Sequence, residues 1–136
     1  MRQRVLAYVT RRRHGRTELL VFEHRDEPAA GTQVPAGRVD PGETLEEGLL
    51  RELHEEAGLA RVRIVRELPV LGAWAGASPY ENHAFEVRAE TAPETWEYVV
   101  HGSGDDAGLV FVYRWVGVDT ELDLWDGRDP TYTQLR

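Results

Sequence analysis

The sequence predicts a single α+β domain, in which a set of strands packs against one well-defined helix. The chain has 136 residues, which suffices for one sizeable core but not for two. Its apolar residues, 41% of the total, gather in strand-like stretches bounded by Gly, Pro or acidic residues. Residues 44–57 show a clear helical pattern, and no repeat or linker divides the chain. We therefore expect one domain over residues 1–136.

Five stretches rich in β-branched or aromatic residues predict the strands. The first two lie on either side of the turn residue Gly15 and predict a hairpin. The other three follow the helix, and the tail at residues 119–136 is expected to hold a short helix. The predicted strands are residues 5–10, 18–23, 62–71, 84–89 and 109–116.

The helix at residues 44–57 has start and stop signals at its two ends. Thr44 is a good N-cap, and Glu47 lies three residues later, at the spacing of a capping box. Gly58 is a typical C-terminal stop. Three leucines recur at i, i+4 and i+8 and form one apolar stripe. They are Leu45, Leu49 and Leu53.

The composition excludes several classes of function. The formal net charge is −8, which argues against binding to the backbone of a nucleic-acid polymer. The chain has no cysteine and no lysine, so disulfides, thiolate metal sites, and cysteine- or lysine-based catalysis are excluded. No apolar run approaches the roughly 18–20 residues that span a bilayer, and residues 5–9 are too few for a secretory signal. We expect a soluble, cytoplasmic protein that does not act at membranes.

Arginines are concentrated at the start of the chain, where the first sixteen residues contain six of them and no acid. The main interpretation is a solvated hairpin, because RRRHGRT lies between two strand-like stretches. The alternative is that these side chains reach the phosphates of an anionic ligand. The six are Arg2, Arg4, Arg11, Arg12, Arg13 and Arg16.

The predicted helix carries acidic side chains next to its apolar stripe. Glu52, Glu55 and Glu56 are spaced i, i+3 and i+4, so they share one sector of the helix at the edge of the stripe. Carboxylates crowded at a partly buried edge raise one another's pKa unless positive charge lies among them. Arg51 can neutralise one of them, and a divalent cation would neutralise the rest. Oxygen ligands without cysteine or a histidine pair favour Mg²⁺ or Mn²⁺ over zinc.

A solvated acidic face is the alternative interpretation of this helix, and it fits Glu46 and Glu47. The segment before the helix favours a ligand site instead. Its sequence PAGRVDPGE contains two prolines and two glycines, which let backbone carbonyls approach a ligand closely. Such a carbonyl would complete a cation shell beside the glutamates.

Together these residues resemble the Nudix box, a motif of the Nudix hydrolase family. Nine specified positions over 23 residues agree with it, so the motif is specific, although it covers about a sixth of the chain. The matching residues are Gly37, Glu43, Arg51, Glu52, Leu53, Glu55, Glu56, Gly58 and Leu59.

The resemblance implies an α/β/α sandwich with a mixed β-sheet, and Mg²⁺-dependent hydrolysis of the diphosphate linkage in a nucleoside diphosphate joined to another group. The implied substrate is a small nucleotide-type molecule, and a homodimer is expected by the same analogy. The resemblance also implies that Arg51, commonly paired with Glu43, orients the acids, and that either Glu52 or Glu56 is the catalytic base. The implied metal ligands are the carbonyl of Gly37 and the side chains of Glu52, Glu55 and Glu56.

Two positions depart from the family pattern. Gly48 stands where alanine is usual; a mid-helix glycine costs about 1 kcal/mol, which indicates close backbone packing there. Residues 31–33 (GTQ) replace an aromatic residue that is common before the box, so a particular mode of base stacking does not transfer.

Residues after the box supply further candidates. Relatives often recruit one more carboxylate from a late loop, and the glycine-rich segment 101–108 favours such a loop, although a plain strand connection fits equally well. The histidines are expected to be surface or core residues rather than bases, and the aromatics core or lid residues rather than base-stacking ones. The candidates are Glu97, Asp105 and Asp106 for the carboxylate, His83 and His101 for the base, and Trp74, Tyr80 and Trp96 for stacking.

Two alternatives to hydrolysis belong to the same family. A non-catalytic nucleotide-binding sensor would not need the complete set of acids that this chain carries. An isopentenyl-diphosphate isomerase depends in its usual form on a cysteine, which is absent here. Nothing outside the box selects among nucleotide sugars, ADP-ribose, damaged nucleoside triphosphates, dinucleoside polyphosphates and coenzyme A.

Overall fold

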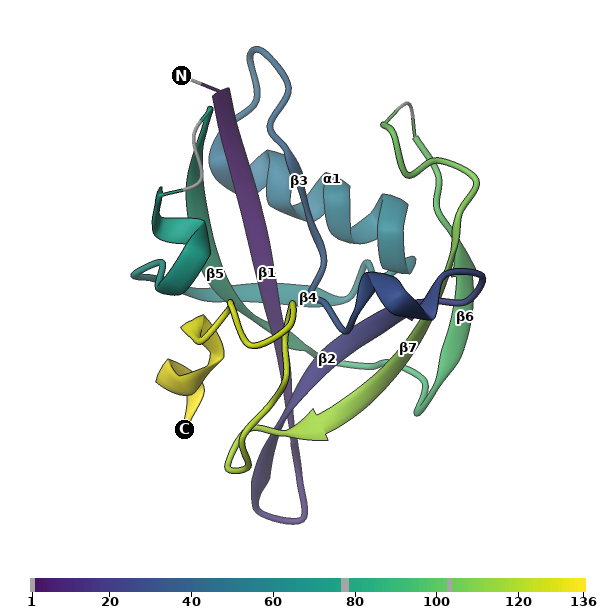
Figure 1. Ribbon diagram of the computed structural model, residues 1–136, viewed down its shortest axis with the longest axis vertical. Coiled ribbons are helices and arrows are strands. Elements are labelled where there is room, and N and C mark those ends of the chain that lie inside the picture. The colour runs from purple at the N-terminus through teal and green to yellow at the C-terminus, as the bar shows by residue number, and fades with distance from the viewer. Residues whose placement is uncertain (1, 77–78, 103) are drawn as a thin grey trace.

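The computed structural model describes residues 2–76, 79–102 and 104–136, and it shows a β-sheet crossed by one α-helix (Figure 1). The strands are β1 (Arg2–Arg13), β2 (Arg16–His24), β3 (Ala36–Arg38), β4 (Val62–Leu68), β5 (Tyr80–Ala89), β6 (Trp96–Val99) and β7 (Val110–Gly117). The helix is α1 (Leu45–Ala57), and three 3₁₀ segments are η1 (Pro28–Ala30), η2 (Gly72–Gly76) and η3 (Thr131–Leu135).

The sheet is mixed and is organised around β1. The strand order is β4-β5-β1-β2-β7-β6, with β3 added as a further partner of β1. The pair β1–β5 is parallel and the other pairs are antiparallel. This arrangement confirms the predicted α+β class with a mixed sheet, and the pair β1–β2 confirms the predicted hairpin.

Each face of the sheet has its own apolar core, because side chains alternate along β1. Val5 and Val9 face α1, whereas Leu6 and Tyr8 pack against η2, η3 and the C-terminal segment. The second face is thus covered by 3₁₀ segments, so the layer opposite α1 contains no α-helix among the residues described. The short helix expected in the tail is η3.

The signals at the ends of α1 act as predicted. The hydroxyl of Thr44 accepts a hydrogen bond from the Glu47 amide (3.1 Å), and the Glu47 carboxylate accepts one from the Thr44 amide (2.8 Å). Gly58 ends the helix at φ 72°, in the left-handed region that glycine tolerates. A Cβ on Gly48 would meet Val39 at 3.2 Å, which confirms the close packing that its glycine indicates.

Two of the observed strands, β3 and β6, were not predicted from the sequence. The three-residue β3 lies in a Pro- and Gly-rich stretch, and β6 follows directly after the bends at residues 91–95. The strand predicted to reach residue 71 ends at Leu68, before Pro69, which cannot donate a ladder hydrogen bond. Among the described residues, no helix has the length and hydropathy to cross a membrane.

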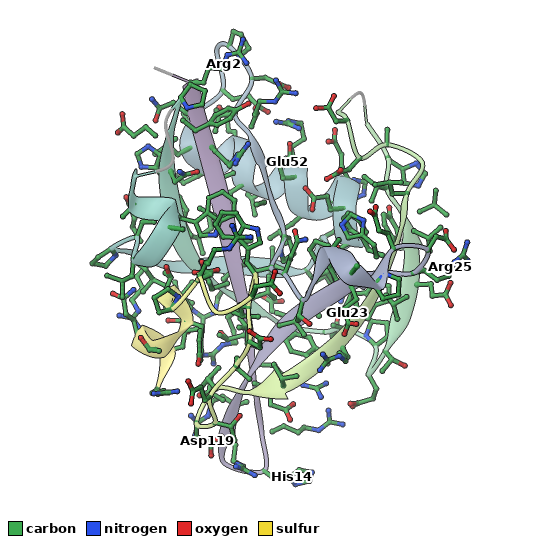
Figure 2. The ribbon with its side chains drawn as sticks, in the orientation of Figure 1. Arg2, His14, Glu23, Arg25, Glu52 and Asp119 are labelled. Atoms are coloured by element: carbon green, nitrogen blue, oxygen red, sulfur yellow. The ribbon has the colours of Figure 1, made fainter. Side chains whose placement is uncertain are left out.

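The hairpin end of β1–β2 accounts for four of the six N-terminal arginines. Arg11 bonds to Glu18 (2.7 Å) and Glu94 (2.9 Å), Arg13 pairs with Glu94, and Arg16 pairs with an aspartate, Asp119. Arg12 bonds to the turn itself, through Thr17 and the Gly15 carbonyl. The solvated-hairpin interpretation is confirmed for Arg12, Arg13 and Arg16, which are exposed, whereas Arg11 is partly buried. The turn of this hairpin, at His14, lies at the opposite end of the molecule from Arg2 (Figure 2).

Candidate functional site

A large cavity of about 890 Å³ opens between β1, β3, α1 and the loop at residues 100–107. It lies where α1 passes the pre-helix segment, near the Glu52 label in Figure 2. All six site residues predicted from the box line this cavity. They are Gly37, Glu43, Arg51, Glu52, Glu55 and Glu56.

The helix geometry explains why the acids face the cavity. Leu49 and Leu53 are fully buried against the sheet, which fixes the rotation of α1. Glu52 and Glu56 follow one turn apart beside this stripe, so their carboxylates lie at its edge rather than in open solvent. Only 5% of the surface of Glu56 is exposed. The solvated-face interpretation is therefore wrong for Glu56, while Glu46 and Glu47 are exposed as expected.

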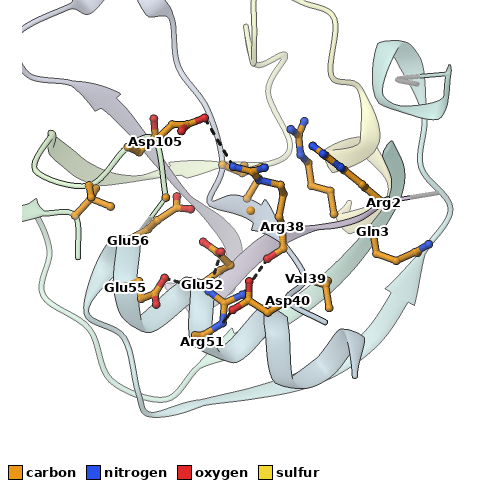
Figure 3. A pocket seen from close by; sticks show the side chains of 18 of the residues that line it. Arg2, Gln3, Arg38, Val39, Asp40, Arg51, Glu52, Glu55, Glu56 and Asp105 are labelled. Carbon is orange, nitrogen blue, oxygen red and sulfur yellow. Dashed lines mark hydrogen bonds and ion pairs between the residues drawn. The ribbon is translucent and has the colours of Figure 1, made fainter. Parts of the chain in front are cut away.

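Arg51 holds several of the acids in place (Figure 3). Its guanidinium makes a two-pronged contact with Glu43 (2.7 and 3.0 Å) and also bonds to Glu52 (3.0 Å) and Glu55 (3.1 Å). A fifth bond, to the Arg38 carbonyl (2.9 Å), ties the helix to β3. The hydrogen bond from Arg51 lowers the pKa of Glu43. Arg51 thus contacts three of the acids of the box, Glu43, Glu52 and Glu55.

Glu52 and Glu56 form an acidic pair, with Glu56 buried and Glu52 partly buried, that Arg51 does not fully neutralise. Burial raises the pKa of Glu52, although bonds to Glu56 and Arg51 oppose this. Burial also raises the pKa of Glu56, well above its ordinary value, and the hydrogen bond and charge of Glu52 and the charge of Asp106 add to the effect. Two carboxylates in this arrangement share a proton or bind a cation, because both cannot stay charged at low cost.

Two glycines allow the backbone to approach these acids. A Cβ on Gly37 would overlap the carboxylate carbon of Glu52, so a larger residue there would displace that carboxylate. Gly102, at φ 102°, lies against Glu55: an added Cβ would come within 2.6 Å of its Oε2. The His101 amide also donates to the Glu55 carbonyl (2.9 Å). Gly102 was not singled out from the sequence, where it is one of several glycines in a loop.

The late loop does reach the cavity, through Asp105 and Asp106. Asp106 contributes to the raised pKa of Glu56, and Asp105 lies 3.8 Å from Arg38. Glu97 is elsewhere: it pairs with Arg25 (3.1 Å) and does not line the cavity. Ser103, in the middle of this loop, lies outside the described residues.

The remaining candidates divide between the cavity and the core. His101 and Trp74 line the cavity, whereas His83 does not line it and bonds to Gln3 (2.6 Å). Trp96 stacks on Tyr113 (4.9 Å) in the core beside α1, as expected for core packing. Tyr80 lies at the start of β5 against an arginine of β1.

Several residues of the cavity wall lie outside the set predicted from the box, and Trp125, Arg2 and Arg4 are three of them. Trp125 stacks on Trp74 at 4.4 Å although the two residues are far apart in the chain. Arg2 and Arg4 line the same wall, having been grouped with the hairpin arginines. Their period-two spacing at the start of a strand was the one available signal, since it puts both on one face.

The donor set suits a hard divalent cation. The available groups are carboxylate and backbone oxygens, and the Glu52–Glu56 pair carries negative charge that a cation would neutralise. The Glu52 carboxylate occupies the space that a Cβ of Gly37 would fill. The carboxylate oxygens therefore lie close to the backbone of Gly37, as expected if both bind one cation. As the side chains lie here, no three acidic or histidine residues in the described ranges surround a common point closely enough to hold a metal ion.

Comparison with known proteins gives consistent matches. The family model described as NUDIX domain matches residues 1–135. An RNA pyrophosphohydrolase from Caulobacter vibrioides is 34% identical over 103 residues, which cover 74% of this chain and 51% of the relative. The chain therefore spans about half the length of that relative.

Solved structures share the fold at low sequence identity. A Caenorhabditis elegans Ap4A hydrolase in a binary complex aligns with a TM-score of 0.63 at 19% identity, covering 88% of this chain and 82% of the other. A UDP-X diphosphatase aligns with a TM-score of 0.62 at 18% identity, covering 98% of this chain and 59% of the other. At such identities these structures show the fold alone.

Proposed function

This chain belongs to the Nudix family, and on that basis we propose that it is a pyrophosphohydrolase that cleaves the diphosphate linkage of a nucleoside diphosphate joined to another group. The observation that carries the proposal is the buried Glu52–Glu56 pair, set against Arg51 on the wall of a cavity large enough for a nucleotide. The relatives' names, RNA pyrophosphohydrolase and Ap4A hydrolase, support the same reaction class.

Each residue of the box has a role in this reaction. Glu52, Glu55, Glu56 and the carbonyl of Gly37 would hold a divalent cation, Mg²⁺ or Mn²⁺. Such a cation, when bound, neutralises charge that develops on the phosphates. Glu52 or Glu56 accepts the proton of the attacking water, a role that a raised pKa suits.

Arg51 and Glu43 position these acids rather than touching the reacting atoms. The two-pronged contact between them anchors the guanidinium, whose Nη1 then fixes Glu52 and Glu55. Fixed carboxylates need no rearrangement during the reaction, which lowers its barrier. A homodimer and a cytoplasmic location stay predictions from the sequence.

A product assay with matched variants tests the proposal. The full chain is incubated with Mg²⁺ and a panel of nucleotide derivatives, and phosphate-bearing products are separated. We expect Glu55→Gln and Glu56→Gln to lose activity at least tenfold. The control is Glu46→Gln, which removes a charge from the exposed side of the same helix and should leave the activity unchanged. Undiminished activity in both site variants would refute the proposal, and tight binding without turnover by the wild type would indicate a sensor.

A further inference from the structure

One wall of the cavity is basic, on the side away from the Glu52–Glu56 pair. β1 and β3 are antiparallel neighbours in which Arg4 lies opposite Arg38, and Arg2 precedes Arg4 by two residues on the same face of β1. All three arginines line the cavity that also holds Glu52 and Glu56. Figure 3 shows Arg38 between these carboxylates on one side and Arg2 on the other. The charge of the cavity therefore changes sign along its length.

Arg4 is held in position by aromatic rings. Its guanidinium carbon lies 3.9 Å from the ring centre of Tyr80 and 5.4 Å from that of Trp74. Trp74 is fixed in turn, since its carbonyl accepts a hydrogen bond from the Asn82 side chain (2.9 Å) and its ring stacks on Trp125 (4.4 Å). A guanidinium clamped in this way loses little freedom when it binds a ligand.

Protein acids do not neutralise the positive charge of this wall. Within the parts of the chain that the structure describes, no carboxylate lies within ion-pair distance of Arg2 or Arg4. Arg38 has one such neighbour, Asp105 at 3.8 Å, whose side chain is 98% exposed. The three arginines also act on Tyr80. A hydrogen bond from Arg2 and the charges of Arg38 and Arg4 lower the pKa of its hydroxyl.

We propose that Arg2, Arg4 and Arg38 bind a phosphate beyond the diphosphate that is cleaved, so that the preferred substrate is a nucleotide with three or more consecutive phosphates. The inference rests on the proposed function, which puts the cleaved linkage at Glu52 and Glu56. A phosphate chain that extends from there towards β1 brings its next phosphate to the arginines, whose planar guanidinium groups bind phosphate oxygens in pairs. A substrate with two phosphates and a sugar would offer hydroxyl groups there instead.

A series of substrates that differ only in phosphate number tests this inference. The probes are diadenosine diphosphate, triphosphate and tetraphosphate, assayed with Mg²⁺. For the wild type, we expect kcat/KM to rise about tenfold or more from the diphosphate to the triphosphate, as a charge-assisted contact predicts. Arg4→Gln and Arg38→Gln should remove this rise. Arg12→Gln, which deletes the same charge at the hairpin turn and outside the cavity lining, should keep this rise.

A binding measurement separates this inference from the proposed function. Inorganic pyrophosphate and tripolyphosphate are titrated calorimetrically into each protein with Mg²⁺ present. A wild type that binds tripolyphosphate about tenfold more tightly, with the preference lost in Arg4→Gln, supports the subsite even if no dinucleotide is cleaved, and in that case the proposed function alone fails. The subsite would be overturned if the wild type bound pyrophosphate and tripolyphosphate with equal affinity. An equal loss of affinity for both ligands in Arg4→Gln and Arg38→Gln would overturn it as well. Arg4→Lys, which keeps the charge, should retain part of the preference.

Discussion

Replacing Glu56 with glutamine should change how the stability of the metal-free protein depends on pH. In the folded chain, burial and the carboxylate of Glu52 raise the pKa of Glu56 well above its ordinary value. The folded pair therefore keeps a proton that the unfolded chain releases as soon as the pH exceeds the ordinary pKa of glutamate, about 4.3. Because the folded state binds the extra proton, its stability falls as the pH rises, and the fall ends once the pH passes the raised pKa of the pair.

The size of the effect follows from the number of protons. One proton held by the folded state and absent from the unfolded state lowers the free energy of unfolding by about 1.4 kcal/mol per pH unit. Glu56→Gln should weaken this dependence, because a neutral amide can bond to Glu52 without a titrating proton, and Glu52 is then the one acid of the pair whose pKa burial raises. The free energies of unfolding of wild type and variant should thus be similar near pH 4. Above this pH they should diverge, with the variant the more stable.

Urea unfolding in EDTA, followed by tryptophan fluorescence at half-unit steps of pH, measures this difference. The matched control is Glu46→Gln on the exposed side of α1, whose pH profile should parallel that of the wild type. Adding Mg²⁺ should flatten the wild-type profile, since a cation would replace the shared proton. Parallel profiles for wild type and Glu56→Gln in EDTA would refute the idea that this pair holds an extra proton in the folded state.

Three further substitutions test individual contacts. Gly37→Ala places a Cβ on the Glu52 carboxylate and should lower kcat by about a hundredfold in steady-state kinetics. Its control is Gly76→Ala, whose added Cβ meets no atom within 4 Å and should leave kcat unchanged; melting curves show whether both variants fold. Thr44→Ala removes the N-cap of α1 and should cost about 1 kcal/mol of unfolding free energy in urea titrations; no loss would show that the capping box contributes nothing. Leu53→Ala should cost about 2–5 kcal/mol in the same measurement, because Leu53 is fully buried, and a loss below 1 kcal/mol would contradict its place in the core.

Much of the fold could be predicted because its signals are local. The capping box of α1, its glycine stop and its leucine stripe all lie within the helix, and the acids of the box follow from the rotation of that helix. The strand β3 escaped prediction because its three residues are held by pairing with β1 rather than by their own propensity.

The basic wall depends on contacts between distant parts of the chain. Trp74 and Trp125 meet only when the sheet has formed, and Trp125 adopts φ 49°, a conformation that its sequence neighbours do not announce. Arg2 and Arg4 are separated from the other N-terminal arginines only by the length of β1, which carries its two ends to opposite sides of the molecule. The composition of the first sixteen residues therefore does not distinguish the two arginines of the cavity from the four of the hairpin.

Calorimetric titration of the metal-free protein with Mn²⁺, in two buffers of different ionisation enthalpy, tests the cation site most directly. We expect saturable binding of Mn²⁺ to the wild type with release of about one proton from the Glu52–Glu56 pair, and at least tenfold weaker binding to Glu56→Gln. Glu46→Gln should bind as the wild type does. Equal binding to wild type and Glu56→Gln, or no binding to the wild type, would contradict the assignment of this pair as the cation site.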